Sequence, residues 1–197
     1  PAQDAIRFIR ESPLAARLGR QVARLGFDGQ ATTQVQLDLT FTGPAKSTRV
    51  TGRTRLDGNT LTLDGTGLVV QALRGDVGFG SAGLDARAVQ ARLFGGPVVF
   101  DLSSGAGRPL RIEPRGEAVA AEVVRYLRLP WPALFDGPVP WQGGVDIAGD
   151  GALTLDLNVE LARATGDLPA PLDGLRRQPM AVLARCACGT PARAWDV

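Results

Sequence analysis

Residues 153–161 alternate strictly between apolar and polar side chains. The apolar members are Leu153, Leu155, Leu157, Val159 and Leu161. A period of two places such residues together on one face of a β-strand, with the polar residues on the opposite face. Residues 139–147 alternate in the same way, though more weakly, and a Gly-Asp-Gly turn separates the two segments. The pattern therefore predicts a β-hairpin with one apolar face.

The same alternation recurs along the middle of the chain. In one segment, Val35, Leu37, Leu39 and Phe41 alternate with polar residues. Further strand-like segments follow at 50–56, 61–63, 68–79, 84–94, 98–102 and 110–112, with turns between them that include 57–59. Strands that recur about every 8–12 residues between glycine-rich turns are typical of an antiparallel all-β architecture.

Two segments, 4–25 and 117–127, follow the helical period instead. In the first segment, Leu14 and Leu18 lie on one apolar stripe, and Gly26 is a natural C-terminal stop. We therefore expect a mostly β fold with two or so amphipathic helices.

The order of these elements repeats along residues 1–175. An amphipathic helix, the tripeptide Phe-Asp-Gly and an alternating strand occur in that order at Phe27 and again at Phe135. A recurring unit predicts an elongated sheet in which neighbouring units, near 12–112 and 117–172, cover one another's apolar surface.

The last stretch, residues 176–197, differs from the rest of the chain. It loses the alternation and holds both cysteines, Cys186 and Cys188. A Cys-x-Cys pair is too close for an easy disulfide and has too few ligands for a structural zinc site. We therefore expect this tail to be disordered, or to be misread sequence.

Groups suited to catalysis or cofactor binding are scarce. The chain has no histidine, which removes the commonest general base and metal ligand. Its 22 basic and 20 acidic residues give a net charge of +2, and the basic residues are scattered. A nucleic-acid surface needs clustered basic residues, and a membrane span needs about 20 apolar residues in a row. We therefore expect no enzyme, no cofactor, no metal site and no nucleic-acid partner.

One motif suggests another function, a nucleotide-binding enzyme. Residues 78–83 match G-x-G-x-x-G, the segment 84–94 could be drawn as a helix, and Asp101 follows at roughly the spacing of a dinucleotide-binding unit. However, the preceding segment carries Arg74 and Asp76, where a buried parallel strand would be continuously apolar. A plain glycine turn between strands is the favoured interpretation.

Several short motifs occur in a fixed order along the chain. They are Ser-Pro-Leu at 12–14, Val-Thr-Gly-Arg at 50–53, Gly-Asp-Val-Gly-Phe at 75–79, Leu-Phe-Gly-Gly-Pro at 93–97, Phe-Asp-Gly-Pro-Val-Pro-Trp at 135–141 and Gly-Asp-Leu-Pro-Ala-Pro-Leu at 166–172. In this order and spacing they resemble the YhdP-type branch of the AsmA-like bacterial envelope proteins. The resemblance covers residues 4–175.

The resemblance implies that this chain is an internal segment of a bridge-like periplasmic lipid-transfer protein, whose inner-membrane anchor lies outside it. The sheet of such a protein curls into an apolar groove that conducts phospholipid between the inner and outer membranes. The implied partners are phospholipid acyl chains, the rest of the parent groove protein and other envelope proteins. The candidate lipid-facing residues are Val35, Leu37, Leu39, Phe41, Leu61, Leu63, Val77, Phe79, Leu153, Leu155, Leu157 and Val159.

The alternation by itself leaves a second interpretation open. An alternating strand normally buries its apolar side against its own core, as in a self-buried sandwich. The chain would then be a structural β-domain of an envelope assembly that binds no ligand.

Overall fold

The structure is a computed structural model, and it describes residues 25–40, 47–63, 66–80, 83–105, 108–128, 137–148, 152–160 and 180–187. These residues contain ten β-strands and one α-helix. In chain order the elements are β1 (Leu25–Asp28), β2 (Ala31–Thr40), β3 (Ser47–Leu63), β4 (Leu68–Gly80), β5 (Gly83–Leu93), β6 (Gly96–Gly105), β7 (Arg108–Val119), α3 (Ala120–Tyr126), β8 (Pro138–Ile147), β9 (Ala152–Val159) and β10 (Met180–Ala187).

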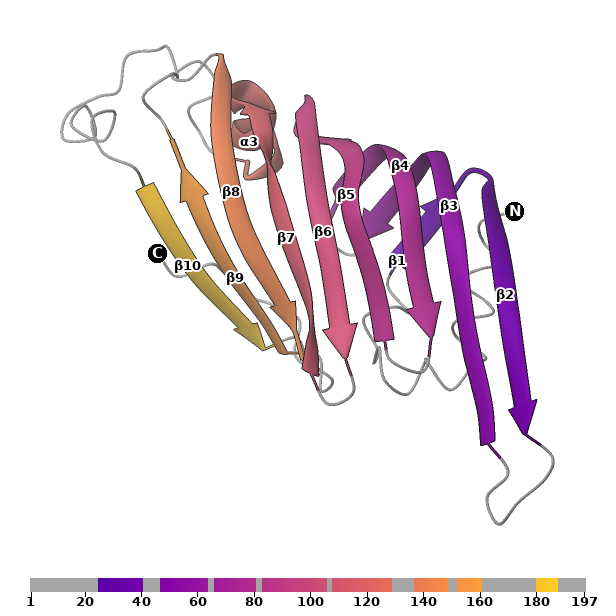
Figure 1. Ribbon diagram of the computed structural model, residues 1–197. Coiled ribbons are helices and arrows are strands. Elements are labelled where there is room, and N and C mark those ends of the chain that lie inside the picture. Colours follow the sequence, from indigo (N-terminus) through magenta and orange to yellow (C-terminus); the bar gives the residue numbers. More distant parts are fainter. Residues whose placement is uncertain are drawn as a thin grey trace, which may run out of the picture.

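All ten strands belong to one antiparallel sheet with the order β1-β3-β4-β5-β6-β7-β8-β9-β10. Strand β2 also pairs with β3, so that β1 and β2 share this long strand and together form one edge. Strand β10 forms the other edge, and the sheet is open between the two (Figure 1). The expected antiparallel, mostly β fold is therefore confirmed, whereas a sheet curled into a groove is not what this arrangement shows.

The helical content differs from the expectation of two or so helices. In the second predicted segment, Glu117, Ala118 and Val119 continue β7 because they pair with β8, so that only Ala120–Tyr126 are helical. The first predicted helix lies outside the described residues except for its last residue, Leu25. That residue begins β1, where it pairs with Leu63.

Two other sequence predictions are corrected by the strand pairing. Residues 57–59 do not form a turn between strands, because β3 runs from Ser47 to Leu63 with a bulge at this point. The glycine motif at 78–83 spans an antiparallel connection, with β4 ending at Gly80 and β5 beginning at Gly83. Since 84–93 is strand and not helix, the dinucleotide-binding interpretation is wrong.

Three bulges keep the alternation in phase across the sheet. They lie at Gly58 in β3, Ala72 in β4 and Ala88 in β5, each with a positive φ, where the strand pairing shifts register. A bulge inserts one residue without a cross-strand partner. The side chains beyond it would otherwise point to the opposite side of the sheet. Leu73, directly after the second bulge, is therefore buried on the same side as Leu56.

Asn59 holds the corner between β1 and β2 against the bulge of β3. Its side chain is fully buried. The amide nitrogen donates to the carbonyls of Asp28 at 3.2 Å and Gln30 at 3.0 Å, and the amide oxygen accepts from the Asp57 N–H at 2.9 Å. The side chain thus satisfies three backbone groups where regular strand pairing is interrupted.

We expect Asn59→Ala to lower the free energy of unfolding by about 1–3 kcal/mol, since it leaves buried backbone groups without partners. Urea unfolding followed by circular dichroism measures this. Asn158→Ala removes an exposed asparagine from β9 and is the matched control. Equal stability of the two variants would contradict the role given to Asn59.

The C-terminal tail contains a strand, which corrects the expectation of a disordered or misread segment after 176. Residues Met180–Ala187 form β10 and pair with β9 along its whole length, from Val159 to Ala152. The remaining tail residues lie outside the described residues. The first predicted helix, apart from Leu25, also lies outside them, as do Phe135 and Asp136 of the second Phe-Asp-Gly tripeptide, and the repeat stays a prediction.

Truncation after Leu175 should expose the backbone of β9 and weaken it, because the cut removes the pairing partner of a sheet edge. We expect the amides of β9 to lose protection in hydrogen exchange, whereas truncation after Ala187 should leave them protected. Unchanged protection in the shorter chain would show that β10 contributes nothing to the sheet.

Candidate functional site: one apolar side of the sheet

Cross-strand register brings the apolar residues of distant segments to one side of the sheet. Directly opposed residues on neighbouring strands lie on the same side. Leu37 is opposite Val50, and Phe79 is opposite both Gly52 and Leu84. We call this side the apolar face.

The apolar face continues to the far edge of the sheet. Leu102 is opposite Ile112, Ile112 is opposite Val145, and Val145 is opposite Leu155. Following the register from β1 to β9, no Asp, Glu, Lys or Arg among the described side chains occupies this side. This uncharged side, which extends from β1 to β9, is the main feature of the described residues.

The structure places the predicted lipid-facing residues on this face, with the exception of Phe41, which lies outside the described residues. They come from β2, β3, β4 and β9: Val35, Leu37, Leu39, Leu61, Leu63, Val77, Phe79, Leu153, Leu155, Leu157 and Val159. The register also adds residues that the sequence pattern did not single out for this role, such as Leu102 and Ile112. Their segments are short or interrupted by proline, so only the strand pairing shows their side. Contact of these residues with lipid stays a prediction.

Exposure varies along the apolar face. At the β2 edge, Val35, Leu37 and Leu39 are 45%, 60% and 51% exposed. In the middle, Leu56, Leu73, Ala91 and Val98 form a buried cluster. Along β9, Leu155 and Leu157 are half-buried. Exposed apolar surface that continues over several strands is typical of a binding surface.

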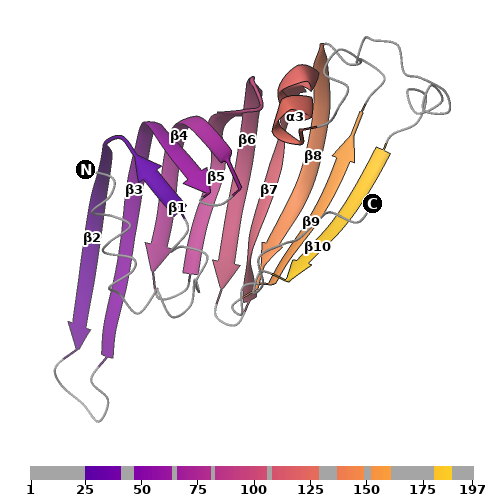
Figure 2. The same cartoon turned by 180° about the vertical axis from the view of Figure 1, so that it is seen from behind.

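Helix α3 packs at one end of this face. Ala120 of the helix and Val139 of β8 are buried together, with Val159 of β9 against them. Figure 2 shows the helix beside β7 and β8 at one end of the strands. Among the described residues, α3 is the one helix, so most of the width of the sheet is a single layer.

Two aromatic residues lie opposite a glycine of the neighbouring strand. The ring of Phe79 lies over Gly52, where a Cβ atom would meet its ring carbons. Trp141 is opposite Gly116 and packs against the buried cluster. The Phe79 ring therefore covers the backbone of the neighbouring strand. The buried Nε1–H of Trp141 has no hydrogen-bond partner.

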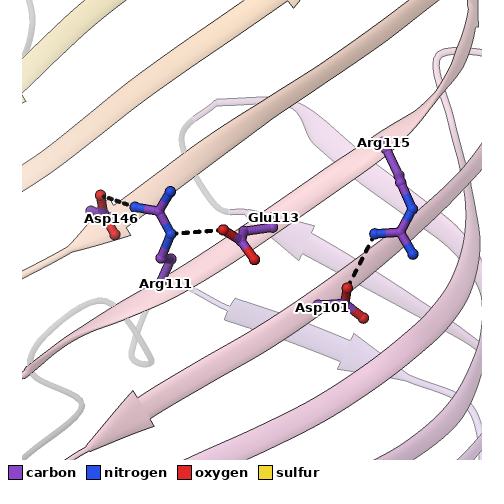
Figure 3. A network of polar contacts seen from close by, with 5 residues as sticks. All are labelled: Asp101, Arg111, Glu113, Arg115 and Asp146. Atoms are coloured by element: carbon purple, nitrogen blue, oxygen red, sulfur yellow. Dashed lines mark hydrogen bonds and ion pairs between the residues drawn. The ribbon is translucent and has the colours of Figure 1, made fainter.

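The opposite side of the sheet, the polar face, carries ion pairs between strands. Arg55 pairs with Asp76 at 3.3 Å, between β3 and β4. Arg111 of β7 lies 2.9 Å from both Glu113 and Asp146 (Figure 3). Exposed pairs of this kind stabilise a fold by only about 0.2–1 kcal/mol each. These charged side chains indicate that the polar face of the sheet faces water.

Asp101 on the polar face stabilises the bulge of β5. Its carboxylate accepts from the Ala88 N–H at 2.6 Å and from Arg115 at 3.1 Å. The hydrogen bond from Ala88, and then the one from Arg115, lower the pKa of Asp101 below its ordinary value of 3.8. Ala88 is the bulge residue with positive φ, so a side chain from the next strand holds a strained backbone position.

A lowered pKa in the folded state gives a defined pH dependence. The stabilisation from Asp101 is present above its unfolded pKa and is lost as pH falls through its folded pKa. We expect Asp101→Asn to be less stable than the parent chain at neutral pH, with a difference that shrinks below pH 3.8. Unfolding curves between pH 2 and 7 measure this, and a difference independent of pH would contradict it.

The described residues contain no group of three or more His, Cys, Asp and Glu side chains that could hold a metal ion. Within the same residues, no helix is long and apolar enough to cross a membrane.

Within the described residues, these features define a class: an open, antiparallel sheet with one face free of charge from β1 to β9. The family model described as YhdP protein matches residues 1–188. The chain therefore belongs to the YhdP family, which confirms its resemblance to the YhdP-type branch of the AsmA-like envelope proteins. The match also includes β10, beyond the 4–175 covered by the motifs. No curated protein and no solved structure matches the chain.

Proposed function

We propose that this chain is a section of a bridge-like periplasmic lipid-transfer protein, in which the apolar face conducts phospholipid between the inner and outer membranes. The observation that carries the proposal is the absence of charged residues from this face among the described side chains of β1 to β9. Membership of the YhdP family, whose proteins are AsmA-like envelope proteins, supports the same role.

The physical argument is that an acyl chain is a suitable cover for such a surface. Burial in an apolar environment gains about 0.8 kcal/mol for each CH₂ group. Neighbouring strands lie about 4.8 Å apart. A chain that moves across the strands, from Leu37 of β2 towards Leu155 of β9, meets apolar side chains at each step, so no step requires a large loss of contact.

In this proposal the sheet curls around the acyl chains in the parent protein, and further strands of that protein continue it at its open edges. The bulges at Gly58, Ala72 and Ala88 support the curling, because a bulge bends its strand and increases its twist. The inner-membrane anchor lies outside this segment, and other envelope proteins act at the ends of the path. The role requires no catalytic group, cofactor or nucleic acid.

A structural β-domain of an envelope assembly is the second candidate. The buried cluster around Leu56 and Val98 favours it, since this part of the face already packs within the chain. The two candidates differ in what contacts the remaining apolar side chains: acyl chains in the first, protein in the second.

Photo-crosslinking in cells separates them. A photoreactive side chain at Leu37 or Leu155 should capture phospholipid, because both positions lie on the apolar face. The same side chain at Asp38 or Asp156 is the matched control, since each is the next residue along its strand and points to the polar face.

Leu155→Asp adds a functional measurement to this experiment. A charge against acyl chains is unfavourable where water is excluded. We expect lipid transfer to fail while the variant keeps its strand content, because an open sheet hydrates a carboxylate more easily than a closed core does. If the variant unfolds and no leucine position captures lipid, these residues line a protein core and the structural candidate is correct.

A further inference from the structure

A recess of about 680 Å³ lies where β3, β4 and β5 approach their ends, and its lining is both charged and apolar. Arg49, Arg53 and Asp85 line it together with Phe79 and Leu84. The register places Phe79 and Leu84 on the apolar face and Arg53 and Asp85 on the polar face. The recess therefore lies at a rim where the two faces of the sheet meet.

Glycine creates the space. Arg53, Gly78 and Asp85 are cross-strand neighbours in one row, so the middle strand has no side chain between the cation and the carboxylate. A Cβ atom at Gly78 would lie 2.6 Å from Oδ1 of Asp85. Gly80 and Gly83 continue the same gap in the next row, where they pair with each other. The floor of the recess is thus bare backbone.

The charges around this floor are not used within the fold. Among the described residues, Arg55, Arg74, Arg111, Arg115 and Arg125 make ion pairs, whereas Arg49 and Arg53 make none. Asp85 also makes no ion pair there. The backbones of Arg53 and Asp85 are two strand spacings apart, about 9.6 Å. Arg53 and Asp85 thus lie on either side of Gly78, and Arg49 lies further along β3, opposite Asp38 of β2.

We propose that the recess binds a zwitterion with one phosphate and one ammonium group, such as a phosphoethanolamine headgroup. The two guanidinium groups of Arg49 and Arg53 bind the phosphate, because arginine pairs well with phosphate oxygens. The carboxylate of Asp85 pairs with the ammonium group. Phe79 and Leu84 lead from the same recess onto the apolar face, where the acyl chains of a phospholipid lie. This inference rests on the proposed lipid-transfer function and names a headgroup for it.

Binding of three probes to the 197-residue chain tests the proposal. They are dihexanoyl phosphatidylethanolamine, dihexanoyl phosphatidylglycerol and glycerophosphoethanolamine, which has no acyl chains. By calorimetry, we expect the ethanolamine lipid to bind at least about fivefold more tightly than the glycerol lipid, because only the former carries an ammonium group for Asp85.

Variants assign the two charges separately. Arg49→Gln with Arg53→Gln should weaken both lipids by about tenfold or more, because both carry a phosphate. Asp85→Asn should remove the preference for ethanolamine and leave the glycerol lipid no weaker. The matched control is Arg55→Gln with Arg74→Gln, which removes the same charge from β3 and its neighbour β4 at arginines already in ion pairs.

Two results would overturn the proposal: an equal effect of the two double-arginine variants, or an ethanolamine preference that survives Asp85→Asn. Tight binding of glycerophosphoethanolamine alone would assign the recess to a soluble compound and overturn the lipid source. Crosslinking at Leu155 reports on the apolar face independently. If the recess proposal fails but Leu155 still captures lipid in the Arg49→Gln, Arg53→Gln variant, the lipid-transfer function stands. If Leu155 captures no lipid even in the chain with both arginines, the lipid-transfer function itself is contradicted.

Discussion

The fold depends on one constraint, which is that a single layer of strands must keep most of its large apolar side chains on the same side. A two-layer sandwich hides such a side between its sheets. Here the described strands form one sheet, and α3 covers only the end of β7 and β8 (Figure 2). The remaining apolar surface is stabilised by contacts within the face, as in the cluster of Leu56 and Val98, or it remains exposed, as at Leu37.

The irregular positions of the sheet serve this constraint. Without the bulge at Ala72, the residues of β4 on one side of it would reverse their direction relative to β3. Positive φ at Ala72 and Ala88 is unfavourable for residues with a Cβ atom. At Ala88 the local cost is offset by Asp101 of the neighbouring strand, which accepts a hydrogen bond from the Ala88 N–H, and within β3 Asn59 satisfies the backbone around Gly58. Polar side chains thus maintain the continuity of the apolar face.

Much of the fold could be predicted from the alternation, and the errors have physical causes. The hairpin of β8 and β9 was predicted because Leu153 to Val159 alternate strictly around a glycine turn. Strand β10 was missed because residues 180–184 are all apolar, so no alternation is visible. Residues 57–59 have the composition of a turn, yet Gly58 lies at a bulge within β3. The candidate lipid-facing residues could be chosen from the alternation within each strand. The side on which Ile112 lies, and the row of Arg53, Gly78 and Asp85, follow only from the pairing of neighbouring strands, which the sequence of one strand does not contain.

The two faces together constrain how an amphipathic ligand could lie on this sheet. Acyl chains on the apolar face leave a headgroup that must reach water, and the ends of the strands are the nearest places where water and polar side chains meet that face. The glycine-floored recess occupies such a place, beside Phe79 and Leu84. If the chain conducts lipid as proposed, a headgroup held there would orient its chains towards the middle of the strands, and exchange to the next lipid position would run across the strands, in the direction of hydrogen bonding. The register therefore separates two directions on the sheet. The headgroup would be held at the ends of the strands, whereas the lipid would move across the strands, so its headgroup would not have to cross the apolar face.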